Sequence, residues 1–156
     1  ERIKRENAMI AAARQRSTPR LDFLEGWIWP AKGIVSGVYG SQRILNGEPR
    51  QPHFGVDIAA PKGAPVVAST PGEVVLAEPD LYYTGGTVIL DHGMGITAVY
   101  SHLATVEVKI GERVSQGQRI GTIGATGRAT GPHLDWRVNW FDVRLDPQRL
   151  LPKQQQ

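Results

Sequence analysis

Glycine and proline divide most of this sequence into short segments, and this punctuation limits the folds that the chain can adopt. The chain has 156 residues, of which 18 are glycine and 11 are proline. From residue 34 onward the segments between them resemble short β-strands. After residue 20, no sustained period of 3.6 residues indicates a helix. The sequence therefore predicts a mainly β domain with antiparallel sheets, long enough to bury one hydrophobic core.

The first part of the chain has a different character. Residues 1–15 are strong helix formers, and Pro19 disfavours continuation of a helix beyond residue 18. We expect an N-terminal helix and a linker over residues 1–29, forming the end of an upstream region. Residues 30–151 are expected to form the main domain, and residues 152–156 a polar tail. Aromatic side chains in residues 21–30 are expected to cover one edge of the sheet.

Composition limits the classes of partner and of site. The net charge of +3 and the pI near 9.5 suit a partner that carries carboxylates or phosphates. Basic residues do not cluster with aromatic ones in the core region, so we expect no nucleic-acid partner. No run approaches the roughly 20 apolar residues of a membrane span. The chain has no cysteine, so any transition metal must be held by histidine and carboxylate groups.

Boundaries of the β-segments follow from the same punctuation. Residues 40–52 are expected to form a polar loop, and residues 87–91 and 96–101 a hairpin. The other predicted strands span residues 34–39, 56–59, 65–68, 72–77 and 120–123.

Residues 131–138 are expected to form one further strand, with its ionisable side chains concentrated on one face. Because side chains alternate along a strand, Leu134, Trp136 and Val138 are expected to face the core. His133, Asp135 and Arg137 then share the opposite face. The same pattern could arise on a rigid functional site or on a solvated sheet surface, so a second segment is needed to decide.

That second segment contains His53 and Asp57, whose spacing of four places them on the same side of a strand. The remaining histidines, His92 and His102, are less informative by themselves. His92 lies in a tight turn and is expected to be a turn residue. His102 ends a strand, on the face of Ala98 and Tyr100 by simple alternation, where a structural hydrogen bond is the ordinary role.

Three motifs in order, with a spacer run between the second and the third, resemble the LytM/lysostaphin-type zinc endopeptidases, which cut peptidoglycan peptides. HFGVDIAAP at residues 53–61 resembles H-x-G-x-D-I-x-x-P, and YSHL at residues 100–103 resembles Y-x-H-L. TGRATGPHL at residues 126–134 resembles T-G-x-x-T/S-G-P-H-L. GERVSQGQRIG at residues 111–121 resembles the family's G-x-x-V-x-x-G-x-x-I-G run. The resemblance covers about three-quarters of the chain.

The resemblance implies both a fold and a site. The fold would be an antiparallel, sandwich- or barrel-like core of the duplicated hybrid motif type. A zinc ion would be held by His53, by Asp57 and by a residue two positions after His133, while His102 and His133 would be the catalytic histidines. The implied substrate is the peptide stem of peptidoglycan, and the implied location is the bacterial cell envelope, in the periplasm.

The third ligand position departs from the family pattern. It is occupied by Asp135 in place of histidine, and Arg137 stands where the family usually has glutamate. A carboxylate is an acceptable zinc ligand, so we expect Asp135 to bind the metal with Arg137 orienting it. The alternative is an ion pair between the two on an exposed strand face.

Two functions are compatible with these residues. The first is a zinc-dependent endopeptidase that hydrolyses peptide cross-links of peptidoglycan, with two histidines assisting the attacking water. The second is a catalytically impaired module of the same fold that binds cell wall or activates a partner hydrolase.

Overall fold

The computed structural model describes residues 1–37, 43–45, 48–50 and 54–151 of the chain. Helix α1 spans Arg2–Arg14, and 3₁₀ helices η1 and η2 span Asp22–Glu25 and Pro147–Leu150. The strands are β1 Ile34–Gly37, β2 Arg43–Leu45, β3 Glu48–Arg50, β4 Val56–Ala59, β5 Pro65–Val67, β6 Gly72–Leu81, β7 Gly85–Asp91, β8 Ile96–Val106, β9 Arg113–Val114, β10 Arg119–Ile123, β11 His133–Trp140 and β12 Val143–Leu145. The predicted N-terminal helix and mainly β class are confirmed.

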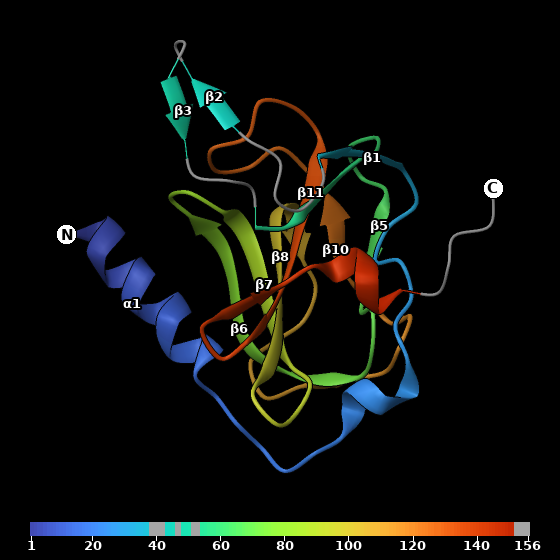
Figure 1. Ribbon diagram of the computed structural model, residues 1–156. Coiled ribbons are helices and arrows are strands. Elements are labelled where there is room, and N and C mark those ends of the chain that lie inside the picture. The colour runs from blue at the N-terminus through green and yellow to red at the C-terminus, as the bar shows by residue number, and fades with distance from the viewer. Residues whose placement is uncertain (38–42, 46–47, 51–53, 152–156) are drawn as a thin grey trace.

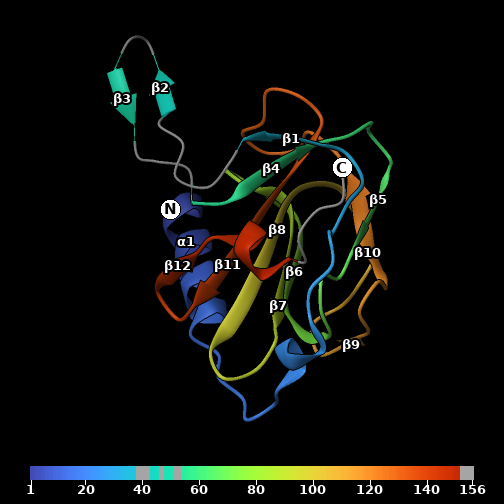
Figure 2. The same ribbon diagram turned by 45° about the vertical axis from the view of Figure 1, so that its right-hand side comes forward.

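One large antiparallel sheet organises the domain. Its strands run in the order β1-β4-β11-β8-β7-β6-β9, and β8 also pairs with β10, which in turn pairs with β5. The pair β5–β10 lies on the side of the domain opposite α1 (Figures 1 and 2). The central strand β8 therefore contacts three partners, and the hairpin predicted around residues 92–95 is present as β7–β8.

The prediction of a polar loop over residues 40–52 was wrong for the part that the structure describes. Strands β2 and β3 pair there as an antiparallel two-stranded sheet, with Arg43 opposite Arg50. Pro49 within β3 would ordinarily argue against a strand, because proline lacks the N–H group that a strand ladder uses and is tolerated mainly at sheet edges. A two-stranded sheet has only edge strands, so this position can accept it.

Alternation along β11 builds the main core. Leu134, Trp136 and Val138 are all fully buried, as predicted from the sequence. They pack in one cluster with side chains from β4 to β10, and Trp27 from the linker joins the same cluster. Burial of this kind contributes roughly 1.5–3 kcal/mol for each large apolar side chain, so the face pattern of β11 fixes which of its residues remain for chemistry.

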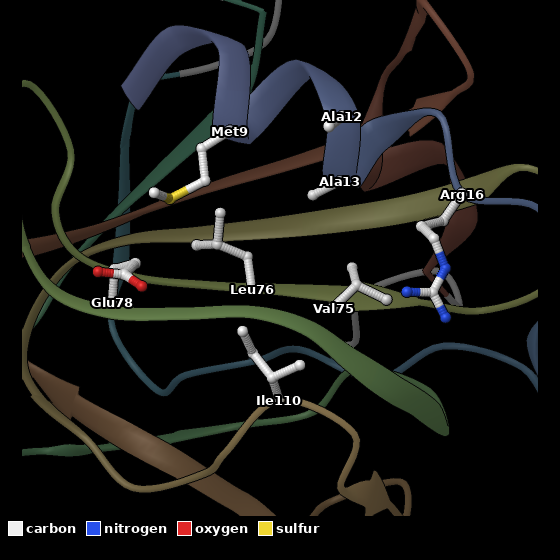
Figure 3. Close-up of a pocket in the computed structure, with 8 residues that line it drawn as sticks. All are labelled: Met9, Ala12, Ala13, Arg16, Val75, Leu76, Glu78 and Ile110. Atoms are coloured by element: carbon white, nitrogen blue, oxygen red, sulfur yellow. The ribbon is translucent and has the colours of Figure 1, made fainter. Parts of the chain in front are cut away.

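Helix α1 covers the other face of β6 and β7 (Figures 1 and 2). Every residue of β7 is buried, and its apolar side chains alternate between the main core and a second cluster beneath the helix. The second cluster comprises Ala13, Leu76, Leu81, Ile89 and Val99. Figure 3 shows Met9 of α1 and Leu76 of β6 directed into a shallow groove between the two elements, with Arg16 and Glu78 on its flanks.

The segment between α1 and β1 is tied to the sheet as well as to the core. Ile28 N–H donates to the carbonyl of Ser69 at 2.9 Å, and Val67 N–H donates to the carbonyl of Pro30 at 2.8 Å. Among the described residues, no helix is long and apolar enough to cross a membrane.

Candidate metal and catalytic site

Two aspartates lie side by side where β4 meets β11. Asp57 is the register partner of Asp135, and its neighbours Val56 and Ile58 face the core. Directly paired residues place their side chains on the same face of a sheet, with Cβ atoms about 4.5–5.5 Å apart. Two like charges at this separation destabilise the sheet, so the pair requires a cation nearby.

Arg137 supplies one such cation. Its Nε donates to Oδ1 of Asp135 at 3.0 Å, and its Nη2 donates to Oδ2 at 3.1 Å. Burial by itself would lower the pKa of Arg137, but the charge and hydrogen bonds of Asp135 outweigh burial and raise the pKa of the guanidinium above its ordinary value. Asp57 contributes to this raised pKa as well. Arg137 is therefore a permanent positive charge that serves both carboxylates.

His133 begins β11 and faces Asp57. Its Nδ1 lies 2.9 Å from the carbonyl oxygen of Gly131, and its Nε2 lies 3.8 Å from Oδ1 of Asp57. A carbonyl oxygen can only accept, so we assign the proton of the neutral ring to Nδ1. This leaves Nε2 as the acceptor nitrogen of the neutral ring, on the side of the Asp57 carboxylate.

His102 faces the site because its backbone is unusual. Its φ of 66° is left-handed, and its N–H donates to the carbonyl of Thr84 at 2.6 Å. Simple alternation would place His102 on the face of Ala98 and Tyr100, which are core residues. That expectation was wrong, because the left-handed residue interrupts the extended strand. The ring lies instead 5.0 Å from that of His133, at an interplanar angle of 42°.

The ring of His102 is held in the same manner as that of His133. Its Nδ1 lies 2.7 Å from the carbonyl oxygen of Thr126, so its Nε2 is also the nitrogen left for chemistry. Burial lowers the pKa of His102, although the hydrogen bond to Thr126 and the charge of Asp135 act in the opposite direction. The neutral imidazole, which can accept a proton, is the form favoured at pH 7.

Thr126 links its own loop to strands β7 and β8 beside His102. Its hydroxyl donates to the carbonyl of Leu103 at 2.8 Å and accepts from the N–H of Gly86 at 2.9 Å. Gly85 has a φ of 64°, and a Cβ at this position would lie 2.2 Å from the hydroxyl oxygen of Thr126. No role for Thr126 was predicted from the sequence. The motif that begins at this threonine was the signal that could have indicated one.

The structure brings four of the five predicted site residues together: Asp57, His102, His133 and Asp135. The fifth, His53, lies outside the described residues. Within the part of the chain that the structure describes, no three histidine, aspartate or glutamate side chains are arranged to hold a metal ion. The predicted ligand set includes His53, so the assignment of metal ligands stays a prediction.

The donor atoms that are described suit a divalent cation. Paired carboxylate oxygens are good ligands for zinc, and an imidazole nitrogen from His53 would complete a mixed set without thiolates. The repulsion between Asp57 and Asp135 also favours a cation between them. His92, in contrast, is fully buried away from this group and does not belong to it.

Comparison with known proteins identifies the family. Residues 51–147 match the model of peptidase family M23, and the chain belongs to this family. The predicted resemblance to LytM-type peptidases is thereby confirmed.

The similar curated proteins include enzymes and an activator. The chain is 46% identical over 87 residues to the peptidoglycan DD-endopeptidase ShyA of Vibrio cholerae, covering 56% of this chain and 20% of ShyA. It is 31% identical over 137 residues to the murein hydrolase activator NlpD of Escherichia coli, covering 88% of this chain and 33% of NlpD. The chain therefore spans about a fifth to a third of the length of these relatives.

A solved structure supports the same fold. A zinc-containing peptidase from Vibrio cholerae superposes with a TM-score of 0.74 and 32% identity, covering 81% of this chain and 41% of that one. The antiparallel sheet described above is thus the fold of a known peptidase family.

Proposed function

We propose that this chain is a zinc-dependent endopeptidase that hydrolyses peptide cross-links of peptidoglycan. The observation that carries the proposal is the convergence of Asp57, His102 and His133 from three separate segments, with both imidazole rings held through Nδ1 by backbone carbonyls. A solvated sheet face has no need for two rings oriented in this way. The name of ShyA, a peptidoglycan DD-endopeptidase, supports the substrate class.

The metal ligands in this proposal are His53, Asp57 and Asp135. A zinc ion held by these residues would polarise the scissile carbonyl and lower the pKa of the attacking water. Asp57 and Asp135 have the donor chemistry for this role and are fixed by the pairing of β4 with β11. The second carboxylate neutralises more of the metal charge than a histidine would, so the water should be less acidic than in a site with one carboxylate.

The two histidines divide the proton chemistry. His102 is held neutral by burial, so its Nε2 is suited to accept a proton from the attacking water. Nε2 of His133 lies 3.8 Å from Oδ1 of Asp57, and because Nδ1 already donates to the carbonyl of Gly131, Nε2 can donate a hydrogen bond only from the imidazolium form. We therefore assign His133 as the donor of a hydrogen bond to the developing oxyanion and His102 as the base.

A second function is favoured by one specific contact. Both oxygens of Asp135 are hydrogen-bonded to Arg137, and a carboxylate used in this way is less available to a metal. In this case the chain would be a module that binds the cell wall or activates a partner hydrolase, as the name of the relative NlpD suggests. Both functions place the protein in the bacterial cell envelope, and we propose the periplasm.

Digestion of purified sacculi separates the two functions. The protein is incubated with sacculi, with and without a chelator, and the released muropeptides are analysed by mass. The endopeptidase predicts conversion of cross-linked muropeptides to monomers, with loss of the activity in chelator and in His133→Ala. Unchanged muropeptides, together with protein that sediments with the sacculi, would show the binding module instead.

A further inference from the structure

The contact between Arg137 and Asp135 is built into the fold. The two residues are neighbours on one face of β11, and the side chain of Asp135 is almost fully buried. Gly55 leaves the space in which the stem of Arg137 lies. A Cβ at position 55 would be 2.6 Å from Cγ of Arg137 and 3.0 Å from Oδ1 of Asp135.

This contact uses lone pairs of the Asp135 carboxylate that a metal ion would also need. A guanidinium fork takes one lone pair on each carboxylate oxygen in one plane, and such bidentate pairs are stronger than single hydrogen bonds between neutral groups. Arginine does not lose its proton in proteins, so a change of pH cannot release the carboxylate by neutralising the guanidinium.

The charges of the site also favour competition between Arg137 and a metal ion. Asp57 and Asp135 together carry two negative charges, and Arg137 already compensates one of them. A divalent ion that enters beside Arg137 meets a like charge as well as an occupied carboxylate. Outward movement of the guanidinium would relieve both costs, and about a third of its side chain is already exposed.

We propose that Arg137 is an internal competitor of the metal: it holds Asp135 in the metal-free protein and must leave before Asp135 can ligate. The inference rests on the proposed metal site. Arg137 thereby sets the affinity of the site for zinc, and the fold stays stable without the ion because the arginine takes its place as counter-ion.

Zinc binding to the full chain tests this inference. We compare wild type, Arg137→Gln and Arg137→Lys by competition for Zn²⁺ with a chelator of known affinity. Arg137→Gln is expected to bind Zn²⁺ about tenfold more tightly or better, because the variant removes both the like charge and the bidentate contact to Asp135. Arg137→Lys keeps the charge but loses the fork, so its affinity should fall between the other two.

Thermal unfolding provides a second measurement that needs no activity. In chelator, Arg137→Gln should melt below wild type, because Asp57 and Asp135 lose the positive charge of Arg137. In excess Zn²⁺ the variant should gain more in melting temperature than wild type, since stabilisation grows with the ratio of free ligand to Kd.

A matched control comes from another bidentate pair on the same sheet. Arg119 donates to both oxygens of Glu107, at 2.9 and 3.2 Å, away from the site. Arg119→Gln should leave Zn²⁺ affinity unchanged.

The outcomes distinguish the inference from the proposed function. If wild type binds Zn²⁺ through Asp57 but Arg137→Gln binds with equal or lower affinity, then Arg137 assists the metal and only the inference is overturned. If neither wild type nor Arg137→Gln binds Zn²⁺ in a manner that Asp57→Ala abolishes, the metal site itself is wrong and both fall.

Discussion

Two groups of aspartate, arginine and histidine lie on the same sheet, and they solve the problem of buried charge differently. In the first group, Asp91 and His92 are completely buried at the end of β7. Arg20 reaches three carboxylates there, of Asp22 at 3.0 Å, Glu73 at 3.2 Å and Asp91 at 3.4 Å. The second group is the candidate site on β4, β8 and β11.

The surroundings of the histidines show how the two groups differ. His92 has its Nδ1 2.6 Å from the carbonyl oxygen of Pro71 and its ring packed edge-on against Trp27. His133 is also held through Nδ1 by a carbonyl, but about a fifth of its side chain remains exposed, as does that of Asp57. The fully buried His92 therefore serves the fold, whereas the partly exposed His133 and Asp57 remain accessible to a ligand.

Removal of the imidazole of His133 should have the largest effect. His133→Ala is expected to lower the rate of muropeptide release by about 10²–10⁴-fold, the usual contribution of a positioned acid or base. Zinc content should be largely unchanged, whereas His53→Ala should lose both zinc and activity. Full activity in His133→Ala would show that the role assigned here is wrong.

Removal of Arg20, the cation of the first group, should affect stability instead of activity. Arg20→Met leaves the fully buried Asp91 without that charge partner, and loss of one partner of a buried pair typically costs about 3–5 kcal/mol. Because Arg20 itself is partly exposed, we expect the lower end of this range in the free energy of unfolding, measured with urea. A change below about 1 kcal/mol would place this pair among ordinary surface pairs.

The pH dependence of stability should report the lowered pKa of the buried His92. Burial lowers the pKa of His92 from its ordinary value of 6.5 to about 4. Between these values the unfolded chain binds the proton and the folded chain does not, so stability is lost as pH falls from 6.5 toward 4. The loss would reach about 3 kcal/mol at the lower end of this window. Titration of the His92 ring near pH 6.5, followed by NMR in the folded protein, would contradict the expected burial effect.

Loss of the exposed pair between Arg119 and Glu107 should have the smallest effect on the free energy of unfolding. Arg119 and Glu107 form two hydrogen bonds, but about half of the Arg119 side chain is exposed. Surface pairs contribute about 0–1 kcal/mol, so Arg119→Gln should unfold close to wild type in urea. A loss similar to that of Arg20→Met would mean that burial does not separate the two cases.

Features that depend on local periodicity were predictable from the sequence. Alternation identified the core face of β11, because Leu134, Trp136 and Val138 obey the two-residue period. Spaced motifs identified the family and most of the residues that converge on the site. These signals are carried by residue type and spacing alone.

Features that depend on a single backbone angle or side-chain direction were not predictable. The left-handed backbone of His102 turns its ring out of the core, and no pattern in its own strand marks this change. The sequence showed that Asp135 and Arg137 share a face, but it left ligand and ion pair as alternatives. The bidentate contact depends on space beside Gly55, which only the packing of β4 against β11 provides.

Anomalous diffraction at the zinc edge, from crystals grown with Zn²⁺, is the most direct test of the metal site. The account predicts one strong peak bound by Asp57, Asp135 and His53, with the guanidinium of Arg137 moved away from Asp135. Crystals without such a peak, in which both oxygens of Asp135 still bind Arg137, would contradict it.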